Sequence, residues 1–299
     1  MPRTLLIVGL LLMSPLVFAS AQNVLIIKSA NNSFFNSTIE QLINQTRKQI
    51  KFQIETLRTI KTNISLLDSS TLIITLGLNA ANFLNDKKLN KPIIHSYLTE
   101  FQYLNLKKPD NHFSILLDQP LQRYLNFIKY LLATQNIGII KHKNNKISSK
   151  KLIELSTTFE LNLEQYLFES GDNPVNMVRE LLQVNDVLLS LPDPEIYNRK
   201  TLKGILLTTY RQNKPMISYS PAHVKSGALA AIYSSPENIG NQIAGLLNKF
   251  LEDKSFKPES HYFASEYGIS INHRVARSLG IKLIDKKEIL KNLKLEQNK

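Results

Sequence analysis

The sequence predicts an α/β fold made of two similar Rossmann-like lobes, each built on a parallel sheet. Apolar runs of strand length alternate with segments of helical period along most of the chain, which is the pattern of strand-helix units around parallel sheets. The order strand, turn, helix and Lys-Pro strand occurs twice, and the last strands begin KPIIHSY at residues 91–97 and KPMISYS at residues 214–220. A chain of 299 residues, 43% of them apolar, can also fill two cores. One compact domain is the alternative that these patterns leave open.

The first 21 residues have the parts of a cleaved secretory signal peptide. Arg3 supplies the charge, residues 5–13 form a short apolar segment, and Ala19-Ser20-Ala21 supplies small residues before the cut. The apolar segment is shorter than the roughly 20 residues that a spanning helix needs. The chain has no cysteine, so the new N-terminus at Gln22 cannot carry the lipid of a bacterial lipoprotein. An exported protein without disulfides is typical of the periplasm, where we expect this protein to be soluble.

The basic composition does not by itself indicate a nucleic-acid partner. Lys and Arg number 37 against 24 Asp and Glu, which gives a formal net charge of +13. Such an excess can mark a protein that binds nucleic acid or an anionic membrane. Most of the lysines are dispersed, however, and the dense cluster KHKNNKISSKK at residues 141–151 is typical of a loop that enters a helix. We therefore expect a solvated basic surface and no nucleic-acid partner.

The expected elements of the first lobe start directly after the signal peptide. They are strands at residues 24–28, 52–57, 72–77 and 92–97, and helices at residues 37–50 and from residue 79 onward. Between Leu57 and Leu72 there is little room for a full helix. Pro92 can open its strand because the N–H that proline lacks is not yet part of the ladder.

The second lobe repeats the alternation over a longer stretch. Its strands are expected at residues 137–141, 163–168, 186–191 and 215–220, and its helices at residues 120–134, 148–159, from 174 and 197–212. A short strand of small residues then runs into Ser-Ser-Pro-Glu and a long amphipathic helix at residues 237–251. Ser235 suits the N-cap of this helix, and Pro236 suits its first position. Near the C-terminus, Asn272 suits the cap of a later helix and Gly280 its left-handed C′ residue.

The segment VKSGALAAIYSSPENIGNQIAGLL, residues 224–247, resembles the signature region of a family of periplasmic ABC-transporter substrate-binding proteins. The matched positions are Val224, Lys225, Gly227, Ala228, Leu229, Ala230, Gly240, Gln242 and Ala244. GISINHRVARSLGIKL, residues 268–283, is similar to the ending of the same family, which includes tryptophan- and tyrosine-binding members. The resemblance covers mainly residues 135–285, and the first lobe agrees in pattern more than in residues.

The resemblance implies the type I binding-protein fold, in which the chain crosses between the lobes three times. We expect these crossings near residues 108–118, 231–235 and 254–258. The first lobe would then comprise residues 22–112 and 234–255, and the second lobe residues 113–233 and 256–299. The long helix after Pro236 should return to pack on the first lobe.

A ligand is expected in the gap between the lobes, outside the carboxyl ends of the strands. The residues that should face this gap are Asn31, Asn32, Gly77, Asn79, Tyr97, His142, Asp193, Tyr219, Ser220 and His223. Simpler interpretations exist for several of them. Asn79 and Asp193 suit helix caps. Tyr97 and Tyr219 suit ordinary aromatic strand ends, and His142 suits a solvated loop.

The residue types in this set argue against an amino-acid ligand. The family's amino-acid-binding members carry a carboxylate after the fifth strand of the second lobe, where this chain has Ser220. Tyrosines, a histidine and asparagines favour a flat or aromatic ligand held by stacking and neutral hydrogen bonds. We expect Tyr219, with Asn79 opposite it, to form the centre of the site.

Catalytic and metal-binding motifs are missing from the sequence. It has no GxSxG, HExxH or phosphate loop, and its six histidines are scattered. We expect no enzyme activity, no cofactor and no metal. The resemblance implies a monomeric periplasmic protein that delivers a small molecule to an ABC permease in the inner membrane. A periplasmic sensor that partners a membrane receptor or kinase is one alternative, and a secreted α/β enzyme is another.

Overall fold

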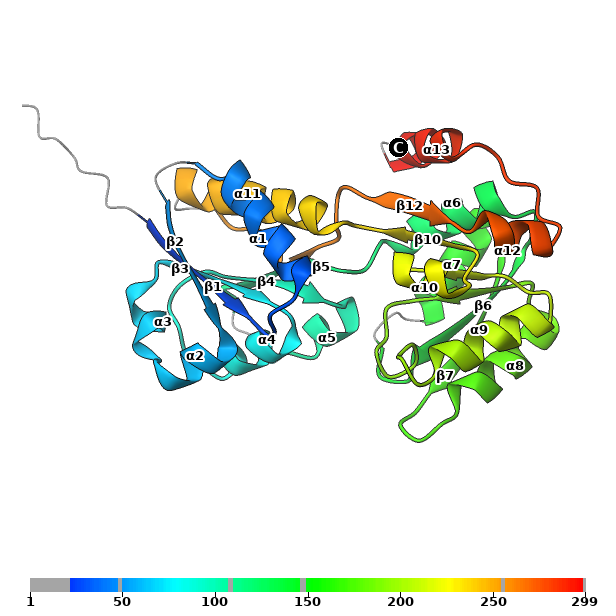
Figure 1. The fold of residues 1–299 in the computed structure, drawn as a ribbon, viewed down its shortest axis with the longest axis horizontal. Helices are drawn as coiled ribbons and strands as arrows, with labels where there is room; N and C mark the ends of the chain where they lie inside the picture. The colour runs from blue at the N-terminus through cyan, green and yellow to red at the C-terminus, as the bar shows by residue number, and fades with distance from the viewer. Residues whose placement is uncertain (1–21, 48–49, 107–109, 146–148, 254–255, 298–299) are drawn as a thin grey trace, which may run out of the picture.

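The protein consists of two α/β lobes, each with a six-stranded sheet covered by helices on both faces (Figure 1). The computed structural model describes residues 22–47, 50–106, 110–145, 149–253 and 256–297. The expected signal peptide at residues 1–21 lies outside the described residues. No helix in the described ranges has the length and apolarity that crossing a membrane requires.

The sheet of the first lobe has the strand order β11-β5-β4-β3-β1-β2, and all of its strands are parallel. The strands are β1 Gln22–Lys28, β2 Ile50–Thr56, β3 Leu72–Leu76, β4 Ile93–Leu98, β5 His112–Leu116 and β11 His261–Tyr262. The helices are α1 Ser33–Gln45, α2 Leu57–Thr62, α3 Ser65–Ser69, α4 Leu78–Asn85, α5 Glu100–Leu104 and α11 Pro236–Glu252. Every residue of β3 is buried, as expected for the centre of a parallel sheet with helices on both faces.

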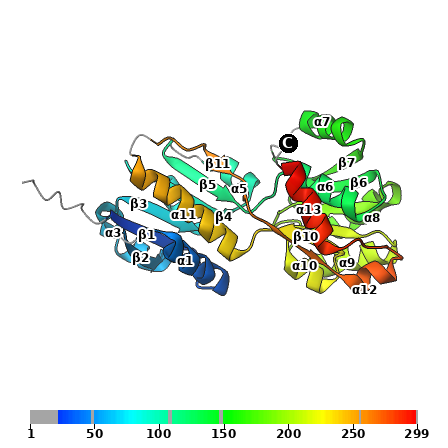
Figure 2. The ribbon, with the colours of Figure 1, turned by 90° about the horizontal axis from the view of Figure 1, so that it is seen from above.

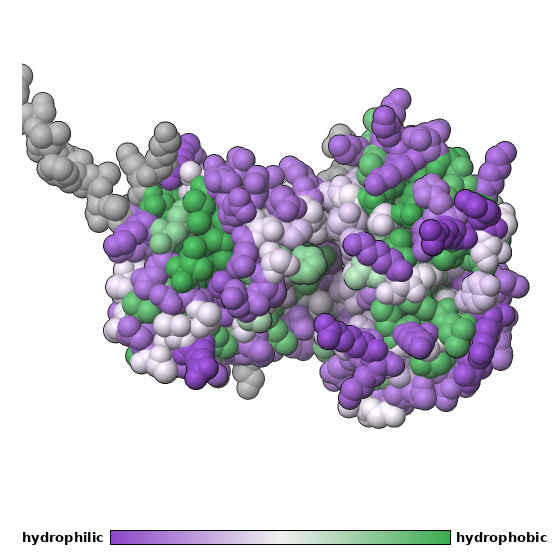
Figure 3. All heavy atoms as spheres, in the orientation of Figure 1, coloured by the Kyte–Doolittle hydropathy of each residue, from purple (hydrophilic) through white to green (hydrophobic). Residues whose placement is uncertain are grey.

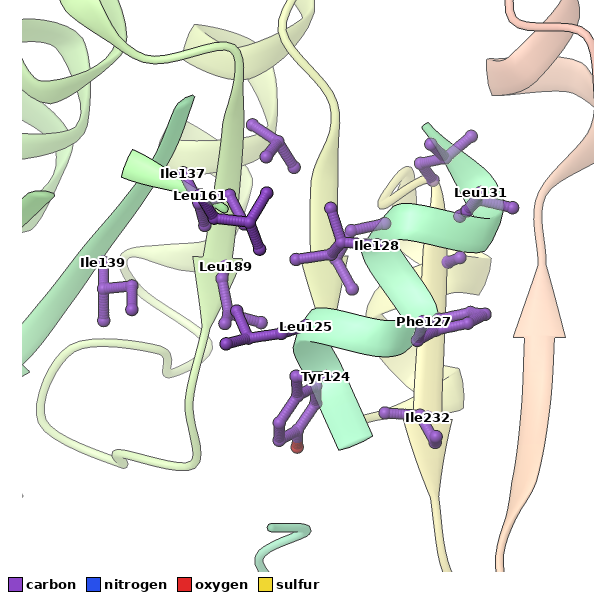
Figure 4. Close-up of a cluster of buried hydrophobic side chains, with 14 of the residues drawn as sticks. Tyr124, Leu125, Phe127, Ile128, Leu131, Ile137, Ile139, Leu161, Leu189 and Ile232 are labelled. Carbon is purple, nitrogen blue, oxygen red and sulfur yellow. The ribbon is translucent and has the colours of Figure 1, made fainter. Parts of the chain in front are cut away.

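The sheet of the second lobe has the order β12-β10-β9-β8-β6-β7, with β12 antiparallel to β10. The strands are β6 Asn136–His142, β7 Asn162–Phe168, β8 Val187–Ser190, β9 Met216–Ser218, β10 Ala230–Tyr233 and β12 Gly268–Ile271. The helices are α6 Leu121–Leu131, α7 Ser149–Phe159, α8 Pro174–Val184, α9 Leu202–Arg211, α10 Pro221–Ser226, α12 His273–Ser278 and α13 Lys286–Gln297. Side chains of α6 pack onto β6, β8 and β10 in the largest apolar cluster of this lobe (Figure 4).

The chain passes between the two sheets three times, at residues 117–120, 234–235 and 263–267. The second passage lies where the sequence predicts it. The first is later than expected because HFSIL forms β5 and extends the first lobe to Leu116 instead of residue 112. The third is also later, because the two residues of β11 pair with β5 before the chain returns to the second lobe. The second lobe therefore does not resume at residue 256.

The long helix after the second passage packs on the first lobe, as predicted. Helix α11 lies alongside α1 in both views of the ribbon (Figure 2). A Cβ on Gly240 would lie 2.6 Å from the carbonyl oxygen of Thr38, so only glycine allows the two helices to approach this closely. The N-cap side chain of Ser235 accepts a hydrogen bond from the backbone N–H of Asn238, and Pro236 occupies the first turn. These features fix α11 directly after its two-residue passage.

The remaining local predictions agree with the structure to within a few residues. Asn272 caps α12, and Gly280 follows that helix with φ of +67°. Two short helices, α2 and α3, occupy the segment between Leu57 and Leu72, where no full helix was expected. Helix α9 begins at Leu202, later than the expected residue 197, because residues 194–200 form turns.

Candidate functional site

Two adjoining pockets lie between the lobes, at the carboxyl ends of the parallel strands. The first has a volume of about 410 Å³ and is lined from the first lobe by α4 and α5 and from the second by Asn144 and Asp193 to Glu195. We call it the Phe101 pocket. The second, the Asp118 pocket, has a volume of about 440 Å³ and is lined by α5, the first passage and Phe263, with Asn145, Lys151 and Leu191 opposite. Figure 3 shows the groove between the two lobes.

The linings of the two pockets show that they adjoin, since residues next to each other in the sequence line different pockets. Glu100 lines the Asp118 pocket and Phe101 lines the Phe101 pocket. On the other lobe, Asn145 and Asn144 are divided in the same way. A ligand of moderate size could therefore occupy both pockets.

An aromatic contact joins the lobes at the edge of the Phe101 pocket. The rings of Phe101 and His142 are stacked, with centroids 5.2 Å apart and planes inclined by 29°. His142 also lies edge-on to Phe168, and its Nε2 is 3.8 Å from a carboxylate oxygen of Glu195. His142 comes from the end of β6, and Phe101 comes from α5. Both rings therefore sit where the two sheets face each other.

Asp118 lies on the first passage and lines the pocket named after it. Its Oδ2 accepts a hydrogen bond of 2.7 Å from the backbone N–H of Glu100. Burial raises the pKa of Asp118 to about 7, and the charges of Glu100 and Asp193 act in the same direction. Burial also raises the pKa of Glu100. The pocket thus holds carboxyl groups whose ionised forms are disfavoured by burial.

Asp193 is the predicted residue that the structure places directly in a pocket. Its Oδ1 accepts hydrogen bonds from the backbone N–H groups of Glu195 and Ile196, at 2.9 and 3.3 Å. The capping interpretation therefore describes this oxygen correctly. The other oxygen, Oδ2, is buried and has no hydrogen-bond partner among the described residues. Burial raises the pKa of Asp193.

Three tyrosines of the second lobe lie near these carboxyl groups. Tyr124 and Tyr197 are buried, and neither hydroxyl has a hydrogen-bond partner among the described residues. Tyr219 is half-buried and lies edge-on to Tyr197 at 6.4 Å. Burial raises the pKa of each tyrosine, and the negative charges of Asp118 or Asp193 raise it further. The charges of the two aspartates thus act on all three hydroxyls, although none of the three tyrosines lines either pocket.

Tyr219 is less suited to the role of a free stacking platform than the sequence suggested. Its ring packs against both apolar clusters of the second lobe and lies 4.8 Å from the ring of His223. His223 is buried and its Nδ1 lies 2.7 Å from the hydroxyl of Ser218. Burial lowers the pKa of His223 to about 4. Tyr219 is therefore part of the packing around the site, and neither it nor Asn79 lines the two pockets.

Most of the other predicted site residues have local structural roles. Asn32 caps α1, Ser220 caps α10, and Asn31 accepts a hydrogen bond from Lys28. Gly77 has φ of +93°, and a Cβ there would lie 2.9 Å from the hydroxyl oxygen of Ser29. All ten predicted residues lie in the described ranges, and the structure brings only Asp193 and His142 to the two pockets or their edge.

Tyr97 and Asn79 also differ from their expected positions. Tyr97 has φ of +61° at the point where β4 shifts register against β5. Its hydroxyl lies 2.5 Å from that of Thr38 on α1, and burial raises its pKa to about 12. Asn79 lies within α4 and is exposed, whereas Gly77 holds the N-cap position. The pocket is instead lined by its helix neighbours Leu78 and Asn82.

Hydrogen bonds cross-link the three passages between the lobes. The side-chain oxygen of Gln119, in the first passage, accepts a hydrogen bond from Arg123. Its amide group donates one to the hydroxyl of Ser234 in the second passage, at 3.0 Å. Ser234 donates to the backbone carbonyl of Glu266 in the third passage. Arg123 donates to the carbonyl of Ala264 at 2.9 Å, and its guanidinium lies over the ring of Tyr267. These contacts join all three passages in one network beside the Asp118 pocket.

Sequence reasoning missed Asp118, Glu100, Phe101 and the two buried tyrosines. One signal was available for Asp118: LLDQP and SLPDP, residues 116–120 and 190–194, both place an aspartate just beyond a strand and before a proline. The first of these motifs was assigned to a crossing instead of to a strand end. Among the described residues, no group of three or more His, Asp or Glu side chains is placed to hold a metal ion.

Comparison with known proteins identifies the family. Residues 37–293 match the model of the ABC transporter substrate binding protein family. No curated protein matches the chain. Similar solved structures include a conserved domain protein from Vibrio cholerae, 17% identical over 91% of this chain and 98% of that one, with a TM-score of 0.62.

Two further solved structures share the fold. An ABC domain from Streptococcus pneumonia in complex with L-Trp is 18% identical, covers 91% of this chain and 98% of its own, and has a TM-score of 0.63. The ligand-free, open structure of a substrate-binding protein with adhesive properties from Clostridium difficile is 14% identical, with coverages of 89% and 97% and a TM-score of 0.68. At these identities the likeness establishes the type I periplasmic binding-protein fold alone. The family match spans most of the chain, and the protein belongs to the ABC transporter substrate-binding protein family.

Proposed function

We propose that the protein is the solute-binding component of an ABC-type uptake system and that it holds a small molecule between its lobes. The observation that carries this proposal is the pair of adjoining pockets whose walls come from both lobes. A ligand that contacts both walls stabilises the arrangement in which the lobes are close. Membership in the family supports a solute-binding role and a transporter partner.

The passages between the lobes support a closing motion. Three short segments connect the lobes, and hinge motions of domains are usually absorbed by a few residues of this kind. Phe101 and His142 already meet across the gap. Residues of both lobes line the two pockets, so rotation about the passages would change the pocket volume.

The expected location follows from the N-terminal sequence and from the family. We propose that residues 1–21 are removed on export and that the protein acts as a periplasmic monomer without a lipid anchor. Mass spectrometry of protein purified from the periplasm should find Gln22 as the first residue. An intact N-terminus or a lipid-modified one contradicts this part of the proposal.

Aromatic side chains at the pocket edge favour a ligand with a flat ring. Phe101 is half-buried and lines the first pocket, and His142 stacks on it. A ligand ring inserted beside Phe101 would gain stacking and burial. The structural neighbour solved with L-Trp is consistent with a ring-bearing ligand.

The experiment combines ligand screening with a measurement of closure. Purified protein is screened by thermal shift against amino acids, aromatic amines, sugars and nucleosides, and each compound that raises the Tm is tested by small-angle X-ray scattering. We expect at least one compound to raise the Tm and reduce the radius of gyration. If no compound binds, and none co-purifies, the proposed function is wrong.

A variant pair tests the site itself. Phe101→Ala should weaken binding about tenfold, because it removes ring stacking and buried apolar area. The matched control is Tyr210→Ala on α9, since Tyr210 is 58% exposed and lies outside both pockets. Uptake of the labelled ligand by cells lacking the gene then separates transport from sensing: lost uptake supports transport, and unchanged uptake with a lost cellular response supports a sensor.

A further inference from the structure

Two carboxyl groups from different parts of the chain meet at the adjoining pockets. Asp118 lies on the passage that leaves the first sheet, and Asp193 follows β8 of the second sheet. The charge of Asp193 raises the pKa of Asp118. The pockets therefore contain two like charges whenever both groups are ionised, and like charges in a poorly solvated site repel each other.

The side chain of Asp193 can accept more hydrogen bonds than the described residues donate to it. Its side chain is 5% exposed, and one carboxylate oxygen is fully occupied by two backbone N–H donors. The second oxygen is buried without a donor. Buried polar atoms in native proteins are usually paired, and an unpaired carboxylate oxygen is among the most costly exceptions. In a pocket, such an atom points to a donor that comes from a ligand.

Two buried tyrosine hydroxyls also lack hydrogen-bond partners among the described residues. Tyr124 is 0% exposed and Tyr197 is 4% exposed, and both hydroxyls lack partners among the described residues. Figure 4 shows the Tyr124 hydroxyl at the edge of its apolar cluster, pointing away from the neighbouring Leu125. The charge of Asp118 influences Tyr124, and the charge of Asp193 influences Tyr197. Each aspartate thus has a buried tyrosine in its vicinity.

The described group whose positive charge lowers the pKa of Asp193 is His142, which carries that charge only when its ring is protonated. His142 lies 3.8 Å from a carboxylate oxygen of Glu195, and Lys143 pairs with Glu169. Lys151 lines the Asp118 pocket, but its ammonium group lies 4.0 Å from Glu154. The guanidinium of Arg123 is occupied by Gln119 and Ala264. A ligand with a positive charge would therefore add to the charge compensation that His142 gives Asp193.

From this arrangement we infer that the pockets bind a ligand with a protonated amine, held between Asp118 and Asp193. The inference deepens the proposed function and rests on it. An ammonium group has three donors and no acceptor, which matches carboxylate oxygens. Tyr124 and Tyr197 line neither pocket, so the contacts to the ammonium group come from the two carboxylates. An organic cation fits better than a metal ion, because the described residues offer no group of three acidic or histidine ligands.

The same arrangement would let the amine of the ligand stabilise the closed state of the lobes. Without a ligand, the charge of Asp193 disfavours the ionised form of Asp118. An ammonium group placed between them replaces this repulsion by attraction to both, and charged hydrogen bonds of this kind are stronger than neutral ones. The inference revises the expectation of a ligand held by neutral hydrogen bonds. The ring contacts of Phe101 and His142 are then suited to the part of the ligand that carries the amine.

The test uses matched probes that differ in charge. Each set contains an amine, its N-acetyl derivative and the corresponding carboxylic acid: tryptamine, N-acetyltryptamine and indole-3-propionate; tyramine, N-acetyltyramine and 3-(4-hydroxyphenyl)propionate; and the hexyl equivalents. Affinities are measured by calorimetry at pH 8, together with mass spectrometry of any small molecule released when the purified protein is denatured. We expect binding among the amines, with acetylation weakening it at least about tenfold.

Variants identify the groups that hold the amine. Asp118→Asn and Asp193→Asn should each weaken amine binding at least about tenfold. Glu180→Gln on α8 is the matched control, since it removes an exposed carboxylate outside the pockets. Far-ultraviolet circular dichroism and the Tm confirm that each variant is folded. Variants of both aspartates that bind amines as tightly as the parent overturn the inference.

The outcomes separate this inference from the proposed function. If neutral or acidic probes, or a neutral or acidic co-purified molecule, bind as tightly as amines and reduce the radius of gyration, the protein binds solutes but the amine site is wrong. If no probe binds and nothing co-purifies, the solute-binding function fails and the inference fails with it. An amine that binds and loses affinity in both variants supports both.

Discussion

Strands β4 and β9 open with the same Lys-Pro pair, yet their terminal tyrosines have different surroundings. When Lys91-Pro92 is aligned with Lys214-Pro215, Tyr219 corresponds to Ser96 and not to Tyr97. A shift of one residue along a strand sends a side chain to the opposite face. Tyr97 packs against Phe35 and Thr38 of α1, within the first lobe. The two lobes thus use similar strand ends for different purposes.

The same contrast holds for buried polar groups in general. In the first lobe, Thr75, His95 and His112 form a continuous chain, with contacts of 2.7 Å and 3.1 Å between their side-chain atoms. In the second lobe, Asp193 and Tyr197 have buried polar atoms that no described residue satisfies. Among the described residues the first lobe also leaves buried polar atoms without a partner, at Asn85 and Asn248, but only Asp193 combines such an atom with a place in the lining of the two pockets.

The largest expected effect is that of pH on stability through the ionisation of Asp118. The titratable groups coupled to it are Glu100 on α5, Asp193 after β8, Tyr124 on α6 and Tyr219 after β9. The folded protein raises its pKa to about 7, so folding favours the protonated carboxyl. Its contribution to stability is present below about pH 4 and is lost as the pH rises to about 7. At pH 8, Asp118→Asn should therefore increase the free energy of unfolding by up to about 4 kcal/mol.

Urea unfolding of the parent and of Asp118→Asn between pH 4.5 and pH 8 measures this effect. The difference between the two curves reports the ionisation of Asp118 together with its coupling to Glu100 and Asp193. Curves that run parallel across this range would show that Asp118 ionises normally. In that case the pocket does not disfavour its charge.

Breaking the first-lobe chain should come next in size. His95→Leu removes the side chain that joins Thr75 to His112, and leaves two buried polar groups without this partner. We expect the free energy of unfolding to fall by about 3 kcal/mol, because each unsatisfied buried group costs about 1–3 kcal/mol. Chemical denaturation at pH 8 measures the loss. A change below about 0.5 kcal/mol would mean that the first lobe does not depend on this chain.

Tyr219→Ala should reduce stability as well as affinity. The ring packs against both apolar clusters of the second lobe and is half-buried. Removing it should cost about 2 kcal/mol of unfolding free energy, less than the about 3–5 kcal/mol typical of a fully buried aromatic ring. A thermal melt measures the change. An unchanged Tm, combined with weaker ligand binding, would restore Tyr219 to the role of a solvated ligand contact.

The smallest effect comes from removing single hydroxyls in each lobe. Tyr103→Phe removes a hydroxyl that donates to the carbonyl of His112 at 3.0 Å and should cost about 1 kcal/mol. Tyr197→Phe removes a hydroxyl without a described partner and should change stability by less than about 0.5 kcal/mol. Both are measured by urea unfolding without ligand. Equal losses in the two variants would contradict the contrast between the lobes.

The fold could be predicted because its signals are local and repeated. Alternating periodicity, the Lys-Pro strand openings and the cap at Ser235 each depend on a few neighbouring residues, and each agrees with the structure. The two short strands, β5 and β11, were not predicted, because the same local signals are too weak in them. HFSIL has five residues and β11 has two, so neither carries a period that distinguishes a strand from a connecting segment.

The site was harder to predict because it depends on orientation across the two lobes. The sequence identified Asp193 and His142, which follow clear strands. It could not show that Tyr97 turns toward α1, since this follows from a left-handed residue at a register shift. Nor could it show that the hydroxyl of Tyr124, inside an amphipathic helix, lies at the edge of its apolar cluster (Figure 4). Such positions depend on contacts between residues that are distant in the sequence.

The network that joins the three passages has a mechanical consequence. Because Gln119, Ser234 and Glu266 are linked by hydrogen bonds, bending one passage strains the contacts of the other two. The three segments should then flex as a single elastic joint, with one dominant axis of rotation. Lengthening residues 234–235 alone would leave the stiffness of this joint set by the other two segments. The range over which the lobes can rotate is therefore set by all three segments together. A change in that range would require substitutions in three parts of the chain that are distant in the sequence.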